Sequence, residues 1–248
     1  MRITGNTILI TGGGSGIGQA LASALHAKGN QVIITGRRRE ALEATVAAHP
    51  GMAYELLDVT DAEAVRAFAE RIVVAWPALN VLVNNAGIMA AETLTADPVD
   101  LAIAEATVAT NILGPIRLTA ALLPHLRAQP KASIVIVTSG LAYVPLVATP
   151  TYSASKAFIR SYTQSLRRQL RGTTVEVLEL APPAVATDLM PGHAENPNSM
   201  PLADYIAEVM SVLEAGNTSD IFVQRTRFFC EAAREGRYDQ VFEAINSH

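Results

Sequence analysis

Residues 7–18, TILITGGGSGIG, decide the fold of this 248-residue chain. The first four residues are typical of a buried strand, and an apolar pattern of helical period starts at Gly16 and ends before Gly29. A strand that turns directly into a helix needs glycine where the backbone takes a positive φ or approaches a ligand closely. The N–H groups and the positive dipole at the start of such a helix favour a pyrophosphate.

The glycines of this turn follow the pattern T-G-x-x-x-G-x-G, with Gly12, Gly16 and Gly18 at the fixed positions. The literal dinucleotide fingerprint, G-x-G-x-x-G, does not fit in any register. A flexible turn without a ligand is the alternative interpretation of a glycine cluster. The position of this cluster, after the first strand and before a helix, favours a nucleotide-binding turn.

Six more β-rich runs alternate with helical patterns along the chain. They lie at residues 31–35, 53–57, 80–84, 133–138, 174–180 and 220–223. Their Val, Ile and Leu content suits strands that helices cover on both faces, so we expect an α/β fold of Rossmann type with a doubly wound parallel sheet of about seven strands. Asp61 is placed to cap a helix. No linker divides residues 1–248, which predicts one domain, and the aperiodic stretch 182–201 predicts a long functional loop.

The composition excludes several classes of protein. Half of the residues are hydrophobic and the net charge is −4, which rules out disorder and leaves no basic surface for nucleic acid. The single cysteine, Cys230, excludes a disulfide framework and is expected to be a packed core thiol. The five histidines lack metal-ligand spacing, so no metal site is predicted. Since we find no signal segment and no apolar run of about 20 residues, we expect a cytoplasmic protein without a membrane span.

An arginine run after the second predicted strand bears on the choice of dinucleotide. A carboxylate that binds the ribose of NAD is expected about 20 residues after the glycine turn, but that position is Gly36 and three arginines follow it. A guanidinium holds a 2′-phosphate through charge-assisted hydrogen bonds. We therefore predict NADP(H) rather than NAD(H), bound mainly by Arg37 with support from Arg38. A solvated basic helix face is the alternative, and it is the better interpretation for Arg39.

Tyr152 and Lys156 are spaced so that their side chains lie on one face of a predicted helix. An ammonium group beside a phenol favours the phenolate, so we expect Lys156 to lower the pKa of Tyr152 from about 10. Such a tyrosine gives a proton to a carbonyl oxygen when hydride reaches the carbon, and takes it back in the reverse reaction. Ser139 follows the fifth strand at the sheet edge where ligands bind, and is placed to hydrogen-bond the same oxygen.

This ordered set of motifs resembles the short-chain dehydrogenase/reductase family over nearly the whole chain. The family pattern also matches Asp58-Val59 after the third strand, the segment Asn84-Asn85-Ala86-Gly87 after the fourth strand, and Asn111. Taken singly, these asparagines are equally well explained as strand ends or polar helix positions. Their occurrence in the family's order makes coincidence an inadequate explanation.

The resemblance implies a nicotinamide cofactor and a catalytic tetrad. The tetrad is Asn111, Ser139, Tyr152 and Lys156, with the asparagine supporting the structure and a proton relay. By the same resemblance, Lys156 holds the nicotinamide ribose and Thr187 contacts the carboxamide. The expected cofactor contacts are Gly12, Ser15, Gly16, Ile17, Gly18, Arg37, Arg38, Asp58, Val59, Asn85, Ala86, Gly87, Tyr152, Lys156, Pro182, Val185 and Thr187.

Two positions depart from the family pattern. Pro182-Pro183 stands where the family usually has Pro-Gly, which predicts a stiffer and more apolar entry to the nicotinamide pocket. Ser15 stands where many NADP-preferring relatives have Arg or Lys, so a 2′-phosphate has one cationic partner fewer. The segments ELAPPAVATDLM at 179–190 and MPLADYIAEVM at 200–210 are similar to a DltE-like branch of the family.

We therefore expect an NADP(H)-dependent alcohol dehydrogenase or carbonyl reductase that acts on a small molecule. The expected substrate contacts are Ser139, Leu141, Tyr152, Pro183 and Met190, although plain packing is an equal alternative for the apolar ones. His193 and Glu195 are interpreted as solvated loop residues, with contact to the substrate as the alternative. The resemblance further implies a homodimer or homotetramer, with a candidate interface on the helix face of Ala157, Phe158, Ser161, Tyr162 and Ser165.

Two other functions remain as alternatives. A catalytically silent NADP-binding sensor would have the same fold, but it would need neither the tyrosine nor its lysine neighbour. An epimerase or dehydratase that uses transient hydride transfer is the second alternative, although such relatives tend to be longer and to carry a larger C-terminal region.

Overall fold

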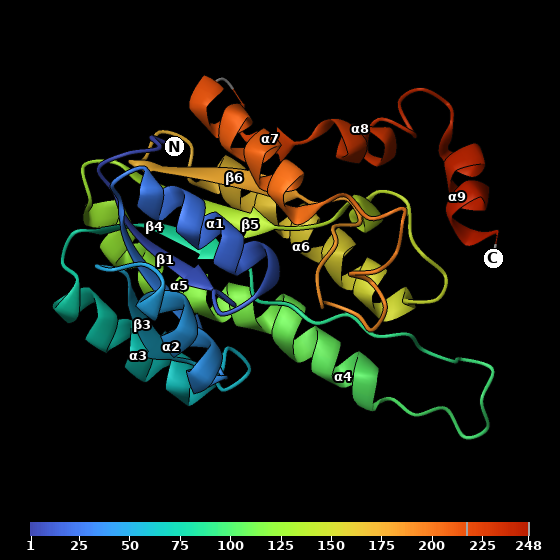
Figure 1. The fold of residues 1–248 in the computed structure, drawn as a ribbon, viewed down its shortest axis with the longest axis horizontal. Helices are drawn as coiled ribbons and strands as arrows, with labels where there is room; N and C mark the ends of the chain where they lie inside the picture. Colours follow the sequence, from blue (N-terminus) through green and yellow to red (C-terminus); the bar gives the residue numbers. More distant parts are fainter. Residues whose placement is uncertain (217, 248) are drawn as a thin grey trace.

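The computed structural model describes residues 1–216 and 218–247, so His248 lies outside the described residues. Helices and strands alternate along the chain (Figure 1). The strands are β1 (Thr7–Thr11), β2 (Gln31–Gly36), β3 (Ala53–Leu56), β4 (Leu79–Asn84), β5 (Ala132–Val137), β6 (Val175–Ala181) and β7 (Asp220–Phe222). The α-helices are α1 (Gly16–Ala27), α2 (Arg39–Ala47), α3 (Ala62–Ala75), α4 (Ala102–Val108), α5 (Gly114–Ala128), α6 (Pro150–Gln169), α7 (Leu202–Ala215), α8 (Gln224–Cys230) and α9 (Tyr238–Asn246). A π-helical turn, η1 (Ala109–Leu113), joins α4 to α5, and a 3-10 turn, η2 (Gly140–Ala142), follows β5.

The described strands form one seven-stranded parallel sheet in the order β3-β2-β1-β4-β5-β6-β7. The predicted fold class is confirmed, and every predicted strand end lies within one residue of the observed end. The order of strands reverses between β1 and β4. In open α/β sheets, ligands bind at this switch point, outside the carboxyl ends of the strands.

Alternate side chains of the strands pack into two hydrophobic cores, one on each face of the sheet. Ile8 and Ile10 in β1 belong to the core with α1, α2 and α7, whereas Leu9 belongs to the core with α3, α5 and α6. All three side chains are fully buried. The two-residue repeat of a strand sends successive side chains to opposite faces, so a strand covered on both sides must be apolar throughout.

The helix ends follow from local chemistry. Asp61 caps α3 as predicted, because its carboxylate accepts hydrogen bonds from the backbone N–H groups of Glu63 (2.9 Å) and Ala64 (3.0 Å). Gly29 follows α1 with φ +80°, a conformation that favours glycine. Helix α1 begins at Gly16, inside the glycine turn, which we define as residues 12–18.

The helical stretch Ala102–Ala128, formed by α4, η1 and α5, is the one stretch among the described residues that is long and apolar enough to cross a membrane. Within its most apolar window, 44% is buried, and Leu118, Leu122 and Leu126 are fully buried under the sheet. The sequence expectation considered only unbroken apolar runs and therefore overlooked this stretch. Its buried leucines identify it as a core helix of the fold.

The loop between β6 and α7 is anchored at both ends. Val185 and Met200 form an isolated parallel bridge, and the backbone N–H of Ala186 donates to the carbonyl of Met200 (2.9 Å). Val185 and Met200 are also buried in the core beside α7. Residues 185–200 thus form a compact loop whose ends are close together, as in the Ω-loops that often carry function.

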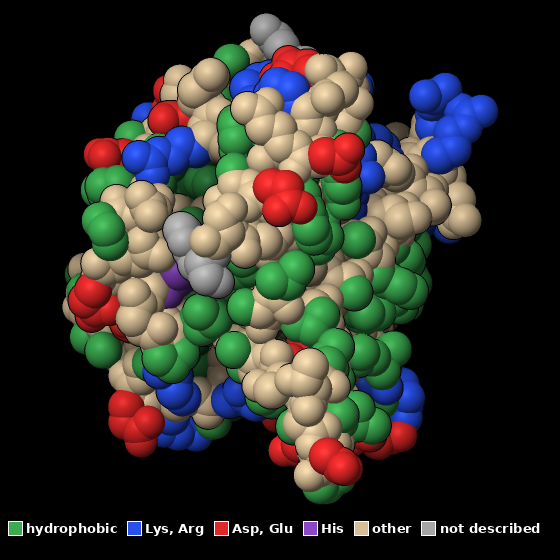
Figure 2. All heavy atoms as spheres, turned by 90° about the vertical axis from the view of Figure 1, so that its right-hand side faces the viewer, with side chains coloured by type: hydrophobic (Ala, Val, Ile, Leu, Met, Phe, Trp, Pro, Cys, Tyr) green, Lys and Arg blue, Asp and Glu red, His purple; other side chains and the backbone are tan. Residues whose placement is uncertain are grey.

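The C-terminal arm, residues 224–247, packs beside the ends of β5 and β7 through contacts of α8 with η2 and β7. Asn246 accepts a hydrogen bond from the backbone N–H of Val147 (2.8 Å) and donates one to the carbonyl of Pro145 (3.2 Å). Figure 2 shows the side of the molecule on which the arm lies, with hydrophobic side chains gathered between scattered charges. Cys230, in α8, is only half-buried, which corrects the expectation of a fully packed core thiol, because this short helix lies at the surface.

Candidate active site

A cavity of about 1010 Å³ runs along the carboxyl ends of the strands. Its wall extends from the glycine turn past the ends of β2 to β6 and on to residues 182–198 and the C-terminal arm. Asn111 alone among the predicted site residues is absent from the wall. The predicted residues that line the cavity are Gly12, Ser15, Gly16, Ile17, Gly18, Arg37, Arg38, Asp58, Val59, Asn85, Ala86, Gly87, Ser139, Leu141, Tyr152, Lys156, Pro182, Pro183, Val185, Thr187 and Met190.

The glycine turn is held against the end of β4 by two polar side chains. The amide of Asn85 donates to the carbonyl of Thr11 (2.8 Å), and the hydroxyl of Thr11 accepts from the backbone N–H groups of Asn85 and Ala86 (3.0 Å each). A Cβ atom on Gly18 would overlap the Asn85 amide and the carbonyl of Gly12. Glycine is therefore required at position 18 for the turn to approach β4, and Asn85 shapes the turn as well as lining the cavity.

The residues around the start of α1 fit a phosphate-bearing dinucleotide. The Ser15 side chain makes no capping bond to α1 and instead accepts a hydrogen bond from Nη2 of Arg38 (2.9 Å). This leaves the helix N-terminus without a side-chain cap at the cavity wall, where its dipole favours an anion. Arg37 also lines the cavity beside Asp58, and its charge helps to lower the pKa of that carboxyl. Two guanidinium groups at one end of the cavity suit the phosphates of NADP(H).

The pKa of Asp58 is set by competing effects. Burial acts to raise it, but hydrogen bonds from the backbone and hydroxyl of Thr60 (2.9 and 2.7 Å), together with the Arg37 charge, outweigh burial and lower the pKa below its usual value. Arg39 has different partners. Its Nη1 donates to the hydroxyl of Tyr54 (3.1 Å), and it pairs with Glu43 outside the cavity wall.

Tyr152, Lys156 and Ser139 meet in the middle of the cavity. Tyr152 and Lys156 are 6% and 5% exposed, and the ammonium nitrogen lies 5.5 Å from the centre of the tyrosine ring. Burial raises the pKa of Tyr152 to about 12, partly offset by a hydrogen bond with Ser139. Burial also lowers the pKa of Lys156 to about 8.

The sequence-based expectation that Lys156 lowers the pKa of Tyr152 is therefore wrong for the protein without ligand. The spacing does place both residues on one helical face, but Nζ of Lys156 donates to the carbonyl of Val137 (2.9 Å) rather than to the phenol oxygen. Both groups are taken out of water, and desolvation disfavours the charged form of each. The tyrosine therefore keeps its proton at neutral pH.

Asn111 lies in η1 and is 2% exposed. Its side-chain oxygen accepts from the backbone N–H of Ile88 (2.9 Å), and its amide donates to the carbonyl of Ile88 (2.9 Å) and the hydroxyl of Ser155 (3.1 Å). The side chain thus joins the backbone after β4 to α6, next to Lys156. This is a structural contribution, and a part in a proton relay stays a prediction.

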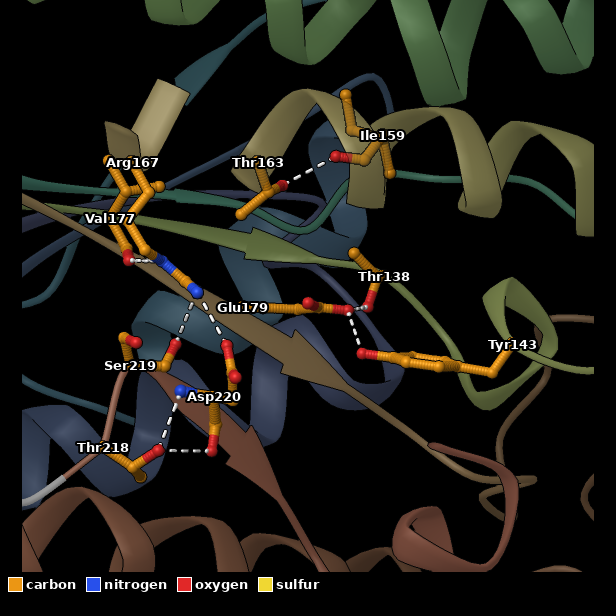
Figure 3. Close-up of polar contacts among 10 residues, drawn as sticks. All are labelled: Thr138, Tyr143, Ile159, Thr163, Arg167, Val177, Glu179, Thr218, Ser219 and Asp220. Atoms are coloured by element: carbon orange, nitrogen blue, oxygen red, sulfur yellow. Dashed lines mark hydrogen bonds and ion pairs between the residues drawn. The ribbon is translucent and has the colours of Figure 1, made fainter. Parts of the chain in front are cut away.

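A buried carboxylate lies behind Ser139. Glu179 in β6 is 1% exposed and accepts hydrogen bonds from the hydroxyls of Thr138 (2.7 Å) and Tyr143 (3.1 Å), as Figure 3 shows. Burial raises the pKa of Glu179, while the hydrogen bonds and the Arg160 charge oppose that rise. The guanidinium of Arg160 lies 4.1 Å from the centre of the Tyr143 ring. Sequence analysis gave no signal for this cluster, because its members come from separate elements.

Several residues that sequence analysis discounted or missed close the other end of the cavity. His193 lines the cavity and is half-buried, which corrects its interpretation as a solvated loop residue. Leu146, Phe229, Ala244 and Ile245 also line the cavity, although no motif marks them. We call the part of the wall formed by Leu141, Leu146, Pro183, Met190, Phe229 and Ile245 the substrate half.

Comparison with known proteins agrees with this geometry. A family model described as short chain dehydrogenase matches residues 6–198. The chain belongs to the short-chain dehydrogenase family. This short-chain dehydrogenase is 38% identical to the uncharacterized oxidoreductase DltE of Bacillus subtilis (strain 168), over 100% of the chain and 99% of that relative. It is 39% identical to serine 3-dehydrogenase of Agrobacterium fabrum, over 73% of each protein.

Solved structures show the same fold. A short chain dehydrogenase from Burkholderia cenocepacia J2315 in complex with NADP superposes with a TM-score of 0.82 at 25% identity, over 98% of each chain. The closed form of a serine dehydrogenase complexed with NADP+ superposes with a TM-score of 0.77 at 26% identity, over 87% of this chain and 93% of that one. The family and the fold predicted from sequence are thus confirmed, and members of this family bind a nicotinamide cofactor.

The buried Lys156 predicts a cost in stability. Its pKa falls from 10.5 to about 8 on folding, so the unfolded chain holds the proton more tightly than the folded chain does. The cost of burying the charged lysine is therefore fully present below pH 8, and it disappears as the pH rises toward 10.5. Lys156→Met should therefore increase the free energy of unfolding of the ligand-free protein by about 2 kcal/mol at pH 7. This value is the cost of burying the charge minus the contribution of the hydrogen bond to Val137, which the variant loses.

Denaturant unfolding at pH 7 and pH 9.5 checks this prediction. The difference between variant and wild type should shrink at the higher pH. Lys131→Met, at an exposed position, is the control and should show no such pH dependence. A variant at position 156 that is less stable than wild type at pH 7 would contradict the argument.

Proposed function

We propose that this short-chain dehydrogenase is an NADP(H)-dependent carbonyl reductase and alcohol dehydrogenase. The observation that carries the proposal is the group of Ser139, Tyr152 and Lys156 on the wall of one cavity, with Tyr152 and Lys156 buried and the ammonium 5.5 Å from the centre of the phenol ring. This group can bind a carbonyl oxygen and move one proton to it. The arginines at the other end of the same cavity support a phosphorylated dinucleotide as the partner.

Each residue has a separate part in the reaction. Ser139 donates a hydrogen bond to the carbonyl oxygen and orients it toward Tyr152. Tyr152, protonated at neutral pH, gives its proton to that oxygen and takes it back when an alcohol is oxidised. When bound, the nicotinamide supplies the hydride to the carbonyl carbon or accepts it from the alcohol. Lys156, fixed by the carbonyl of Val137, places a positive charge near the phenolate that remains after proton transfer.

The preference for NADP(H) over NAD(H) rests on Arg37 and Arg38. Both line the end of the cavity that begins at the glycine turn, and the bond from Arg38 to Ser15 orients one guanidinium there. Ser15 therefore contributes by positioning an arginine, which compensates for the missing basic residue at its own position. The NADP complexes among the solved relatives support this choice.

The outer surface of the fold supports a homo-oligomer of single-domain subunits. Phe158 in α6 is 49% exposed, and Ala157, Ser161 and Ser165 on the same helix are also exposed. Further exposed hydrophobic side chains occur at Leu101, Val108 and Leu113. A small-residue and apolar surface of this kind suits contact with a second copy, and a dimer or tetramer is consistent with it.

Tyr152→Phe removes the proton donor and keeps the ring. It should lower kcat for ketone reduction by at least about 100-fold, because general acid catalysis contributes about 10²–10⁴-fold. The Kd of NADPH, measured by fluorescence, should stay close to that of wild type. Tyr162→Phe, on the same helix but outside the cavity wall, is the control. Cofactor binding by a wild type that reduces no ketone or aldehyde would favour a sensor instead.

Arg37→Ala tests the cofactor preference. The ratio of kcat/KM with NADPH to that with NADH should fall by about 10- to 100-fold, which corresponds to loss of a hydrogen bond to a charged group of about 1.5–3 kcal/mol. Arg39→Ala should leave the ratio unchanged, because Arg39 pairs with Glu43 outside the cavity wall. An unchanged ratio in Arg37→Ala would remove the role given to this residue.

A further inference from the structure

We infer that the substrate half of the cavity takes uncharged, apolar ketones and aldehydes, and that Phe229 and Ile245 of the C-terminal arm set the size that fits. This inference rests on the proposed function and narrows its substrate class. The packing of the arm against the reaction centre, the distribution of charge along the cavity and the extent of the family match support it.

The arm is fixed close to the reacting groups. A Cβ atom placed on Gly140, the residue after Ser139, would lie 3.1 Å from the ring of Phe229, so this ring packs directly on the turn after β5. Ile245 packs in the small core around Val144, and the next residue, Asn246, holds the segment at 145–147. That segment leads into α6, which carries Tyr152. The arm therefore forms a wall with fixed contacts to the reaction centre.

The charges of the cavity wall leave a substrate carboxylate without a partner. Arg37 and Arg38 lie at the opposite end, with the glycine turn. Lys156 is 5% exposed, and its Nζ already donates to the carbonyl of Val137. The loop that faces the substrate half contributes the acidic Asp188, the uncharged amides of Asn196 and Asn198, and His193. Burial lowers the pKa of His193 below its usual value, so its imidazole is neutral at pH 7 and offers no cation. A carboxylate in this half would lose its hydration without gaining a cation, whereas an apolar group gains free energy by leaving water.

The arm lies outside the part of the chain that matches the general family. The family match ends at residue 198, before α8 and α9, and the serine 3-dehydrogenase of Agrobacterium fabrum aligns over only 73% of the chain. The relative named DltE aligns over 100% of it. The part of the chain that lies beyond the family match thus includes the wall formed by Phe229 and Ile245.

The first experiment compares two classes of substrate with NADPH. A neutral aryl alkyl ketone should have a kcat/KM about 100-fold or more above that of a 3-oxo carboxylate of similar size, because the buried anion has no partner. Equal or greater turnover of the anion would overturn the inference. Loss of all carbonyl turnover, with normal NADPH binding, would instead contradict the proposed function, so the two failures are distinguishable.

The second experiment changes the wall. Phe229→Ala and Ile245→Ala should each change kcat/KM for the neutral ketone by about 10-fold or more, with the Kd of NADPH unchanged. Phe228→Ala is the matched control, because this neighbouring ring is 45% exposed and does not line the cavity. Thermal melts show whether each variant is folded. If folded Phe229→Ala and Ile245→Ala both keep the substrate profile of wild type, the arm does not set specificity.

The structure also assigns a positioning role to Glu179, on independent grounds. Its two hydrogen-bond donors lie on either side of Ser139 in the chain. Thr138 directly precedes Ser139, and Tyr143 follows the η2 turn that Ser139 caps. Ser139 accepts a hydrogen bond from the backbone N–H of Leu141 (3.1 Å), so the serine and the turn move as one unit. One buried carboxylate oxygen therefore holds both ends of the segment that presents the serine hydroxyl.

The surroundings of Glu179 show why an apolar residue would not serve equally well. Removing a carboxylate from water costs several kcal/mol, so such a group is a poor choice for packing alone. Here Arg160, one turn after Lys156 on α6, lies over Tyr143 and contributes a compensating charge. Asp220 in β7 and Cys230 in α8 are the other titratable groups that act on this cluster. The cluster thus links β6, η2 and α6 around Ser139.

A pair of glutamates on one strand provides the test. Glu179→Ala should lower kcat by about 10- to 100-fold with little change in the Kd of NADPH, because small misplacements of a reacting group have effects of this size. Glu176→Ala is the control: Glu176 accepts a hydrogen bond from Ser133 (2.9 Å), the same kind of contact at the opposite end of the β5 and β6 pair. It should change stability and leave kcat unchanged.

Glu179→Gln separates hydrogen bonding from charge. The amide oxygen can accept both hydroxyl bonds, so this variant should restore kcat to within about threefold of wild type. If Glu179→Ala fails to fold, Tyr143→Phe removes one of the two bonds and should show an intermediate loss of kcat. Folded variants at positions 179 and 143 with the kcat of wild type, or an equal loss in Glu176→Ala, would overturn the positioning role.

Discussion

The close approach of the glycine turn to the end of β4 is the contact on which the rest of the site depends. Asn85 and Thr11 bind the two segments together across the switch point of the sheet, and the turn has no room for a side chain at Gly18. This contact sets the position and direction of α1. The helix N-terminus, the arginines after β2 and the end of β5 then line one continuous cavity. A sheet buried on both faces keeps these strand ends in register.

The burial of Tyr152 and Lys156 has an electrostatic cost. Tyr152 holds its proton more tightly than a solvated tyrosine, and Lys156 holds its proton less tightly than a solvated lysine. Both changes have the same cause, since charged forms are poorly solvated inside the protein. At neutral pH the tyrosine is consequently protonated, and the lysine, with a pKa of about 8, is still mostly charged. The functional arrangement is therefore less stable than an apolar pair would be.

The two ends of the cavity differ in how far they lie within the part of the chain that matches the family. The end near the glycine turn lies within residues 6–198, which match the short-chain dehydrogenase family, and its arginines and helix N-terminus suit a phosphate. The other end is completed by the C-terminal arm, where apolar side chains face the reacting groups. A nucleotide is recognised by charge and backbone dipoles at strand ends, whereas a substrate is recognised by shape.

The sequence by itself determined the parts of this protein that depend on neighbouring residues. Strand positions follow from aliphatic runs, the turn from Gly12, Gly16 and Gly18, and the face shared by Tyr152 and Lys156 from helical spacing. Only the tertiary structure decided the direction of the pKa changes, the hydrogen bonds by which Glu179 holds Thr138 and Tyr143, and the wall formed by Phe229 and Ile245. These depend on burial and on contacts between residues far apart in the chain. Local spacing contains no information about which distant groups exclude water or accept a hydrogen bond.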